Sequence, residues 1–144
     1  MKIRKMIKED IPQLEILYRL YWNEKSDIEK MKEKFDEINK REDYIILSAE
    51  ENNKLTGSVM GIVCQELYGP CKPFLVVENL VVAKDAQRKG VGKALMAEIE
   101  KFAKKQDCRQ IILVTESDRE DALSFYPAIG FPKGTNSGFK KKIK

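Results

Sequence analysis

The fold of this chain is decided by residues 74–96, which read FLVVENLVVAKDAQRKGVGKALM. Phe74 to Val82 form an almost continuous apolar run, which predicts a strand buried on both faces. From Val91 onward, apolar residues recur every three or four positions, as on one face of a helix. A further apolar run at 111–114 predicts a second buried strand. The order strand, helix, strand makes the two strands parallel in a right-handed βαβ unit.

The residues before this unit predict two helices. Apolar side chains spaced three and four apart indicate a first helix that begins near Pro12 and extends to Tyr21. Ser26, with Glu29 three residues later, has the pattern of a capping box and predicts the start of a second helix. This second helix has a thinner apolar stripe, so we expect it to lie on the surface.

The remaining segments predict strands and one short helix. Two strands over 44–49 and 55–64 flank a polar turn and form a hairpin. After the βαβ unit, a helix over 118–126 is expected to end before Pro127, and residues 139–143 are expected to form the last strand. The resulting class is a mixed α/β fold.

Length and composition set further limits. The chain has 144 residues, of which 42% are hydrophobic and 35% are charged, so we assign residues 1–144 to a single soluble domain. The net charge of +4 suits an anionic ligand. The sequence contains no groove-reading or stacking motif for nucleic acid. It also contains no apolar stretch long enough for a signal peptide or a membrane anchor, so we expect a cytoplasmic protein.

The residue types present exclude several chemistries. The chain has no histidine, which removes Ser-His-Asp and Cys-His catalysis and histidine-ligated metals. The three cysteines, Cys64, Cys71 and Cys108, are widely spaced and include no Cys-x-x-Cys pair. This pattern argues against a disulfide framework and against a metal site. Proton transfer must therefore use carboxylates, tyrosine, lysine, cysteine or water.

The turn between the strand and the helix contains Gly90 and Gly92. Glycines let the backbone approach a ligand closely, and a helix N-terminus carries partial positive charge, so the turn suits phosphate groups. A glycine-bent turn without a ligand is the alternative. Two common nucleotide motifs fail, because the dinucleotide fingerprint requires glycine at Leu95 and the Walker loop requires glycine at Gln87 and Ser or Thr at Ala94.

Two stretches of the sequence resemble motifs of the GNAT superfamily of N-acetyltransferases. Gln87-x-x-Gly90-x-Gly92 resembles the acetyl-CoA motif of that family, (Q/R)-x-x-G-x-(G/A). Residues 122–131, ALSFYPAIGF, resemble its second motif, a helix that ends Phe-Tyr and is followed by Gly-Phe. The order of elements agrees over nearly the whole chain. Pro127 departs from the family pattern, because a charged or polar residue is common there.

The resemblance implies a central mixed, mostly antiparallel sheet flanked by helices, in which one parallel strand pair splays apart to admit acetyl-CoA. It implies that backbone groups at the end of the first strand pair with the pantetheine amides and that the glycine turn holds the pyrophosphate. The expected cofactor-binding residues are Leu80, Val81, Val82, Gln87, Arg88, Lys89, Gly90, Val91, Gly92 and Lys93. The basic side chains among them could instead be solvated cations. No metal is expected.

The resemblance also implies that an acetyl group moves from acetyl-CoA to a primary amine by direct attack in a ternary complex, with coenzyme A as product. An alkylammonium is almost fully protonated at pH 7, so a base is required. Glu78, a carboxylate in a strand expected to be buried, is the candidate base, and Tyr126 is the candidate acid for the leaving thiolate. Structural roles are the alternative for both. Tyr21, Trp22 and Asn79 are candidates for contact with the acceptor.

Other readings of the sequence remain open. The chain could be a non-catalytic acyl-CoA-binding regulatory module, or a nucleic-acid-associated protein that uses its lysine-rich C-terminus. The acceptor could be a small molecule or a protein amine. The oligomeric state is open as well, with a homodimer among the alternatives.

Overall fold

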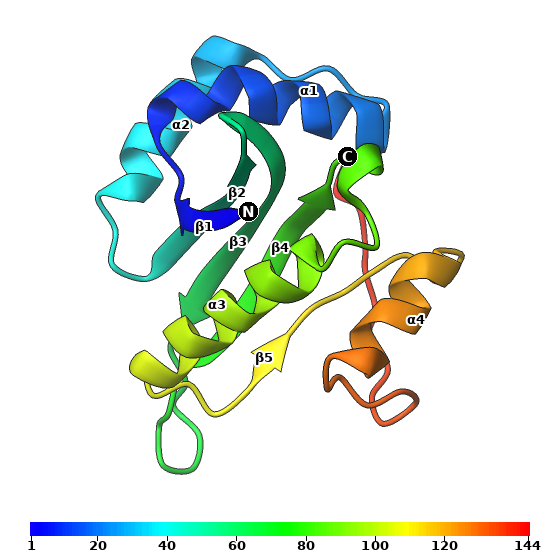
Figure 1. Cartoon of the computed structure of the whole chain (residues 1–144). Coiled ribbons are helices and arrows are strands. Elements are labelled where there is room, and N and C mark those ends of the chain that lie inside the picture. The colour runs from blue at the N-terminus through cyan, green and yellow to red at the C-terminus, as the bar shows by residue number, and fades with distance from the viewer. The chain divides into compact units, whose positions relative to one another are not determined.

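A five-stranded sheet organises the first of two compact units of the chain (Figure 1). The computed structural model describes residues 1–144, and its units are Met1–Ile112 and Leu113–Lys144. The strand order in the sheet is β1-β2-β3-β4-β5. The strands are β1 (Lys2–Lys5), β2 (Tyr44–Glu51), β3 (Lys54–Cys64), β4 (Phe74–Val82) and β5 (Ile111–Ile112). The helices are η1 (Lys8–Asp10), α1 (Ile11–Trp22), α2 (Ile28–Asn39), η2 (Lys84–Ala86), α3 (Val91–Lys105) and α4 (Glu120–Ala128).

The sheet is mostly antiparallel with one parallel pair, as expected. Strands β1 to β4 pair antiparallel in sequence order, and β4 pairs parallel with β5. The parallel register contains only two pairs, Leu75 with Ile111 and Val76 with Ile112. From Val77 onward, β4 therefore has no β5 partner.

The prediction of a buried strand over 111–114 is wrong in both length and burial. Strand β5 ends at Ile112, whose exposed fraction is 41%, and Val114 is 59% exposed. An apolar run of β-branched residues does not distinguish an edge strand, which is covered on one face, from a central one.

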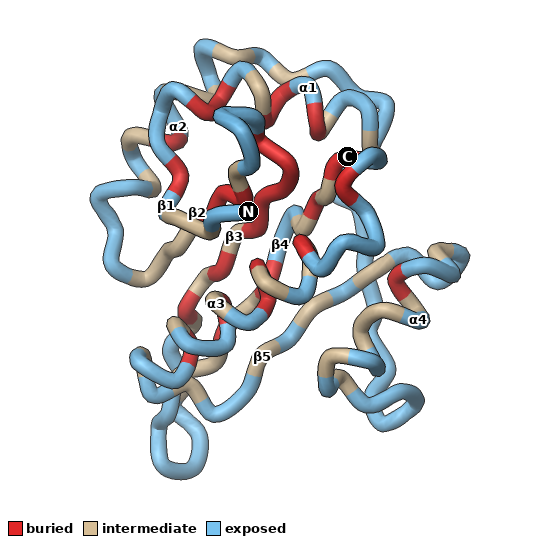
Figure 2. The backbone as a smooth tube through the Cα atoms, viewed as in Figure 1, coloured by how far each residue is buried: buried red, intermediate tan, exposed pale blue.

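Helix α3 packs against one face of the sheet through two glycines of β3. A Cβ atom on Gly57 would lie 3.0 Å from Cγ1 of Val91, and one on Gly61 would lie 3.1 Å from Cδ1 of Ile99. These contacts require glycine because the helix approaches the strand so closely. Leu95 of α3 is fully buried in the same layer, and Figure 2 shows the buried positions concentrated along β3 and the inner side of α3.

Helices α1 and α2 cover the other face. The side-chain carbonyl of Gln13 in α1 accepts a hydrogen bond from the amide of Leu55 in β3 at 2.9 Å. Helix α2 is capped by Asp27, whose carboxylate accepts from the amide of Lys30 at 3.1 Å. The predicted cap at Ser26 is therefore wrong by one residue. Aspartate caps a helix as well as serine does, so the two adjacent candidates could not be separated by residue type.

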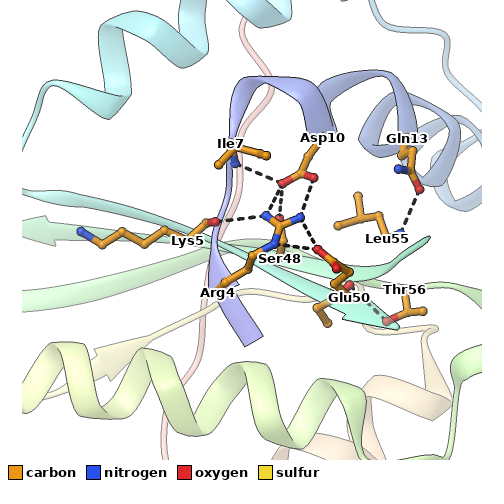
Figure 3. A network of polar contacts seen from close by, with 10 residues as sticks. Arg4, Lys5, Ile7, Asp10, Gln13, Ser48, Glu50, Leu55 and Thr56 are labelled. Atoms are coloured by element: carbon orange, nitrogen blue, oxygen red, sulfur yellow. Dashed lines mark hydrogen bonds and ion pairs between the residues drawn. The ribbon is translucent and has the colours of Figure 1, made fainter. Parts of the chain in front are cut away.

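A partly buried ion-pair network joins β1, the start of α1 and β2 (Figure 3). Arg4 binds both carboxylate oxygens of Asp10, at 2.7 and 2.9 Å, and its Nε donates to Glu50 at 2.7 Å. Asp10 also accepts from the hydroxyl of Ser48 at 2.9 Å and from the amide of Ile7 at 3.1 Å. Burial would raise the pKa of Asp10, but these hydrogen bonds outweigh it and hold the pKa below its usual value.

The second unit contains α4 and the C-terminal segment. Pro127 lies inside the last turn of α4, although the sequence predicted that the helix ends before it. In a last turn the missing N–H of proline removes only one helical bond, and turns from Ile129 to Tyr126 and from Gly130 to Pro127 close the helix. Tyr126 therefore keeps helical backbone geometry.

The predicted final strand over 139–143 is absent. Phe139 is 96% exposed and Ile143 is 84% exposed. Apolar and lysine residues alternate here as in a strand, but a strand needs a partner for its backbone groups, and no strand pairs with this segment. No helix in the structure is long and apolar enough to cross a membrane.

Candidate active site

Strand β4 contains a β-bulge at its middle. Glu78 lies opposite Met60 of β3, and Val81 lies opposite Ser58, so β4 has one residue more than β3 between these pairs. The extra residue is accommodated at Asn79, whose φ of 54° is in the left-handed region that asparagine tolerates better than most residues. Bulges re-aim side chains and occur often beside active sites.

The bulge changes the environment expected for Glu78. Its side chain is exposed, so the argument that desolvation poises it as a base is not supported. Residues directly opposite each other in an antiparallel pair project to the same face, which places Glu78 beside the half-buried Met60. The polar interruption of an apolar run thus marked a bulge and an accessible carboxylate.

Three aromatic residues gather at the C-terminal end of α1. The ring of Trp22 lies 5.0 Å from that of Tyr18 and 5.0 Å from that of Tyr21. The side chain of Tyr18 forms a hydrogen bond with that of Asn79. The candidate acceptor residues Tyr21, Trp22 and Asn79 are therefore brought together, with Tyr18 as the link.

Tyr18 was not singled out by the sequence. Burial raises its pKa to about 12, and the hydrogen bond with Asn79 acts in the opposite direction. The phenol is therefore neutral at physiological pH and can hold Asn79 by a hydrogen bond. The sequence does group Tyr18 with Tyr21 and Trp22 as aromatic residues of the first helix, but this spacing is also that of ordinary core residues, and it does not predict the contact with Asn79.

The segment from Gln87 to Lys93 leads into the first turn of α3, and two of its residues have left-handed backbone conformations. Gly90, the N-cap of α3, has φ of 83°, and Arg88 has φ of 61°. The amide of Ala94 makes the first helical bond, to the carbonyl of Gly90 at 2.9 Å. The amides that precede Ala94 in the helix have no partner within it, as at every helix N-terminus. They are therefore available to donate hydrogen bonds to an anion.

Three cationic residues flank these amides in the sequence. Arg88, Lys89 and Lys93 are exposed, and none of them forms an ion pair. Asp85, the carboxylate closest to them in the sequence, pairs with Lys54 at 3.2 Å. Cations at a helix N-terminus are repelled by the helix dipole. A negatively charged ligand at this position would offset that repulsion.

An open cleft of about 900 Å³ lies between α1 and the end of β4. The sequence does not predict it, because its walls come from three segments that are distant in the chain, within 13–21, 54–55 and 81–87. Its apolar lining is formed by Ile16, Leu17, Leu20, Tyr21, Val81 and Val82. The cleft extends to Gln87, the first residue of the loop before α3.

Tyr126 lies in the second unit, near the end of α4. It is half-buried, and its ring packs edge-on against Phe125 at 5.2 Å and against Phe131 at 5.8 Å. These contacts unite the two parts of the predicted Phe-Tyr and Gly-Phe motif.

A mixed sheet with one short parallel pair, together with a cation-rich glycine loop at the start of α3, is the arrangement that the sequence resemblance to N-acetyltransferases predicts. The chain belongs to the acetyltransferase (GNAT) family, whose model matches residues 11–131.

Individual relatives are distant. YdhI, an uncharacterized protein of Bacillus subtilis (strain 168), is 26% identical over 76 residues, which are 53% of this chain and 44% of YdhI. The chain thus matches less than half the length of this relative. A putative acetyltransferase from Agrobacterium tumefaciens str. C58 has a similar structure, with a TM-score of 0.90 at 21% identity over 99% of this chain and 100% of that one. AAC(6')-Iy, in complex with the bisubstrate analog CoA-S-monomethyl-acetylneamine, gives a TM-score of 0.81 at 19% identity over 99% and 98% of the two chains.

Proposed function

We propose that this chain transfers an acetyl group from acetyl-CoA to a primary amine on a small molecule or a protein. The observation that carries the proposal is the loop before α3, where helix amides without a partner in the helix lie next in sequence to basic side chains that form no ion pair. A pyrophosphate would accept from the amides of Val91, Gly92 and Lys93 and would neutralise the nearby basic side chains.

The pantetheine arm is assigned to the edge of β4. Strand β4 loses its parallel partner after Val76, so backbone groups of Leu80 and the amide of Val82 are available to pair with the two amides of pantetheine, as an added strand would. The carbonyl of Val82 accepts a hydrogen bond from the side-chain amide of Gln87 at 3.3 Å. This places the thioester near the bulge at Asn79. We treat residues 1–144 as one acetyltransferase domain, because the family match extends over both units.

The reaction is a direct transfer with both substrates bound. The neutral amine nitrogen attacks the thioester carbonyl, the new C–N bond forms, and the C–S bond breaks to release coenzyme A as a thiolate. One proton leaves the amine and one is taken up by the sulfur. The bisubstrate complex of AAC(6')-Iy supports a site that holds cofactor and acceptor together.

Two residues are assigned to the protons. Glu78 accepts the amine proton, directly or through water, because the chain has no histidine and the carboxylate is exposed beside the expected position of the thioester. Tyr126 donates to the thiolate, a role assigned from its place in the Phe-Tyr motif. The aromatic cluster around Trp22, together with Asn79, is assigned to the acceptor.

The test measures thiol release from acetyl-CoA across a panel of amines: amino acids, polyamines, aminoglycosides and lysine peptides. Turnover that depends on both acetyl-CoA and one amine supports the proposal. A control without amine measures plain hydrolysis of the thioester. Tight binding of acetyl-CoA without turnover on any amine contradicts catalysis and favours a non-catalytic acyl-CoA-binding module.

A further inference from the structure

Two large apolar side chains of α1 are exposed on the same side of the helix. Leu20 is 76% exposed and Ile16 is 46% exposed. Residues four apart are neighbours on a helix surface, so the two side chains form a continuous apolar stripe. Leu14 and Leu17, in contrast, are buried against the sheet. The exposed stripe is therefore additional to the face that holds α1 in the fold.

The stripe is one wall of the cleft of about 900 Å³ described above. Val81 and Val82 at the end of β4 and Gln87 in the following loop also line this cleft. Such a volume falls within the ordinary range of small-molecule sites, roughly 300–1,000 Å³. A small ligand fits an apolar stripe inside a cleft of this size better than the flat surface of a protein partner does.

The position of the cleft indicates which ligand it binds. It connects Val82, where one of the pantetheine amides is proposed to pair, with Gln87, where the pyrophosphate loop begins. A ligand bound at both places must pass between them. The acceptor amine has to approach the opposite end of the cofactor, near Glu78 and Asn79. Of the residues assigned to the acceptor, only Tyr21 lines the cleft, so Tyr21 marks the boundary between the two ligands.

We infer that Ile16 and Leu20 form an apolar wall against which the pantetheine arm of acyl-CoA packs. The inference rests on the proposed function and adds residues outside both sequence motifs. Pantetheine suits such a site because its two amides can face the backbone of β4 while its methylene and methyl groups face α1. Contact with the ligand removes exposed leucine and isoleucine surface from water, which is favourable.

The test compares two ligands on wild-type protein and on Leu20→Asn by calorimetric titration. The ligands are acetyl-CoA and 3′-phospho-ADP, which lacks pantetheine. The variant is expected to bind acetyl-CoA about tenfold more weakly, which corresponds to ~1.4 kcal/mol, and to bind the nucleotide as the wild type does. Leu20→Met, which keeps an apolar side chain, should restore most of the affinity.

A matched control is Leu67→Asn. Leu67 is 94% exposed in the connection between β3 and β4 and does not line the cleft, so its replacement should change neither affinity. Unchanged acetyl-CoA affinity in Leu20→Asn, or an equal loss for both ligands, would contradict the role of Ile16 and Leu20 as a wall for pantetheine. Either result would leave the proposed function intact. Failure of the wild-type protein to bind acetyl-CoA overturns the proposed function and this inference with it.

Discussion

Glu78 of β4 lies directly opposite Met60 of β3, and its carboxylate is exposed. The pairing fixes the face of the sheet to which the carboxylate projects, and the bulge at Asn79 follows immediately. A base in this position can reach solvent as well as a bound substrate. It therefore does not need to be desolvated to take part in proton transfer, and a water chain can connect it to the amine.

Replacing Glu78 by glutamine should lower kcat/KM most near pH 7. The substitution keeps the shape but removes the proton acceptor. The loss should shrink as the pH rises toward about 10, because an alkylamine then arrives already neutral. The measurement is a pH–rate profile of wild type and Glu78→Gln, with Glu42→Gln, an exposed carboxylate remote in sequence, as control. Parallel profiles of wild type and Glu78→Gln at every pH would show that Glu78 is not the base.

Tyr126→Phe removes one hydroxyl and keeps the ring that packs against Phe125 and Phe131. If the phenol protonates the thiolate, kcat should fall roughly 10²-fold or more, within the usual range for general acid catalysis. The affinity for acetyl-CoA should change little. Tyr68→Phe, at an exposed position, controls for loss of a phenol elsewhere. Wild-type turnover in Tyr126→Phe would assign Tyr126 to packing alone.

Asp10→Asn should lower the free energy of unfolding by about 2 kcal/mol at pH 7, because Asp10 is buried and accepts charge-assisted bonds from Arg4. The folded-state pKa of Asp10 lies below its usual value. Its stabilisation is therefore complete above the unfolded pKa of about 3.9 and is lost as the pH falls through the folded-state value. The difference between variant and wild type should shrink below about pH 4.

Urea unfolding at a series of pH values measures this effect. Asp36→Asn is the matched control, because Asp36 pairs with Lys8 at an exposed position and should change stability by less than about 1 kcal/mol. A difference for Asp10→Asn that stays constant down to pH 3 would show that the carboxylate charge does not stabilise the fold.

The sequence located the elements whose burial and periodicity are strong. Strand β4 has the predicted bounds, Phe74 to Val82, and α3 begins at Val91 as expected. Both signals are local: a long apolar run and a glycine turn before an amphipathic repeat. The left-handed backbone at Gly90 follows from the same local chemistry, since glycine adopts it without steric cost.

The errors over residues 111–114 and 139–143 have a common origin in tertiary context. The burial of residues 111–114 and the pairing of 139–143 depend on neighbouring strands that a sequence pattern does not reveal. The hydrogen bond between Tyr18 and Asn79 likewise joins residues about 60 positions apart. The cleft beside Leu20 is lined by apolar side chains whose spacing in the sequence is that of core residues. Such features appear only when the elements are assembled.

The most direct test of the central claim is the thermal midpoint of unfolding with and without millimolar acetyl-CoA. A ligand at a hundred times its Kd stabilises the native state by about 2.7 kcal/mol, so a rise of several degrees is expected. Gly90→Val should abolish the rise, because its side chain would occupy the place of the phosphate. Gly134→Val, with a similar φ of 75° and equally open surroundings, should show the same backbone strain yet keep the rise. An unchanged midpoint of the wild-type protein would contradict the account.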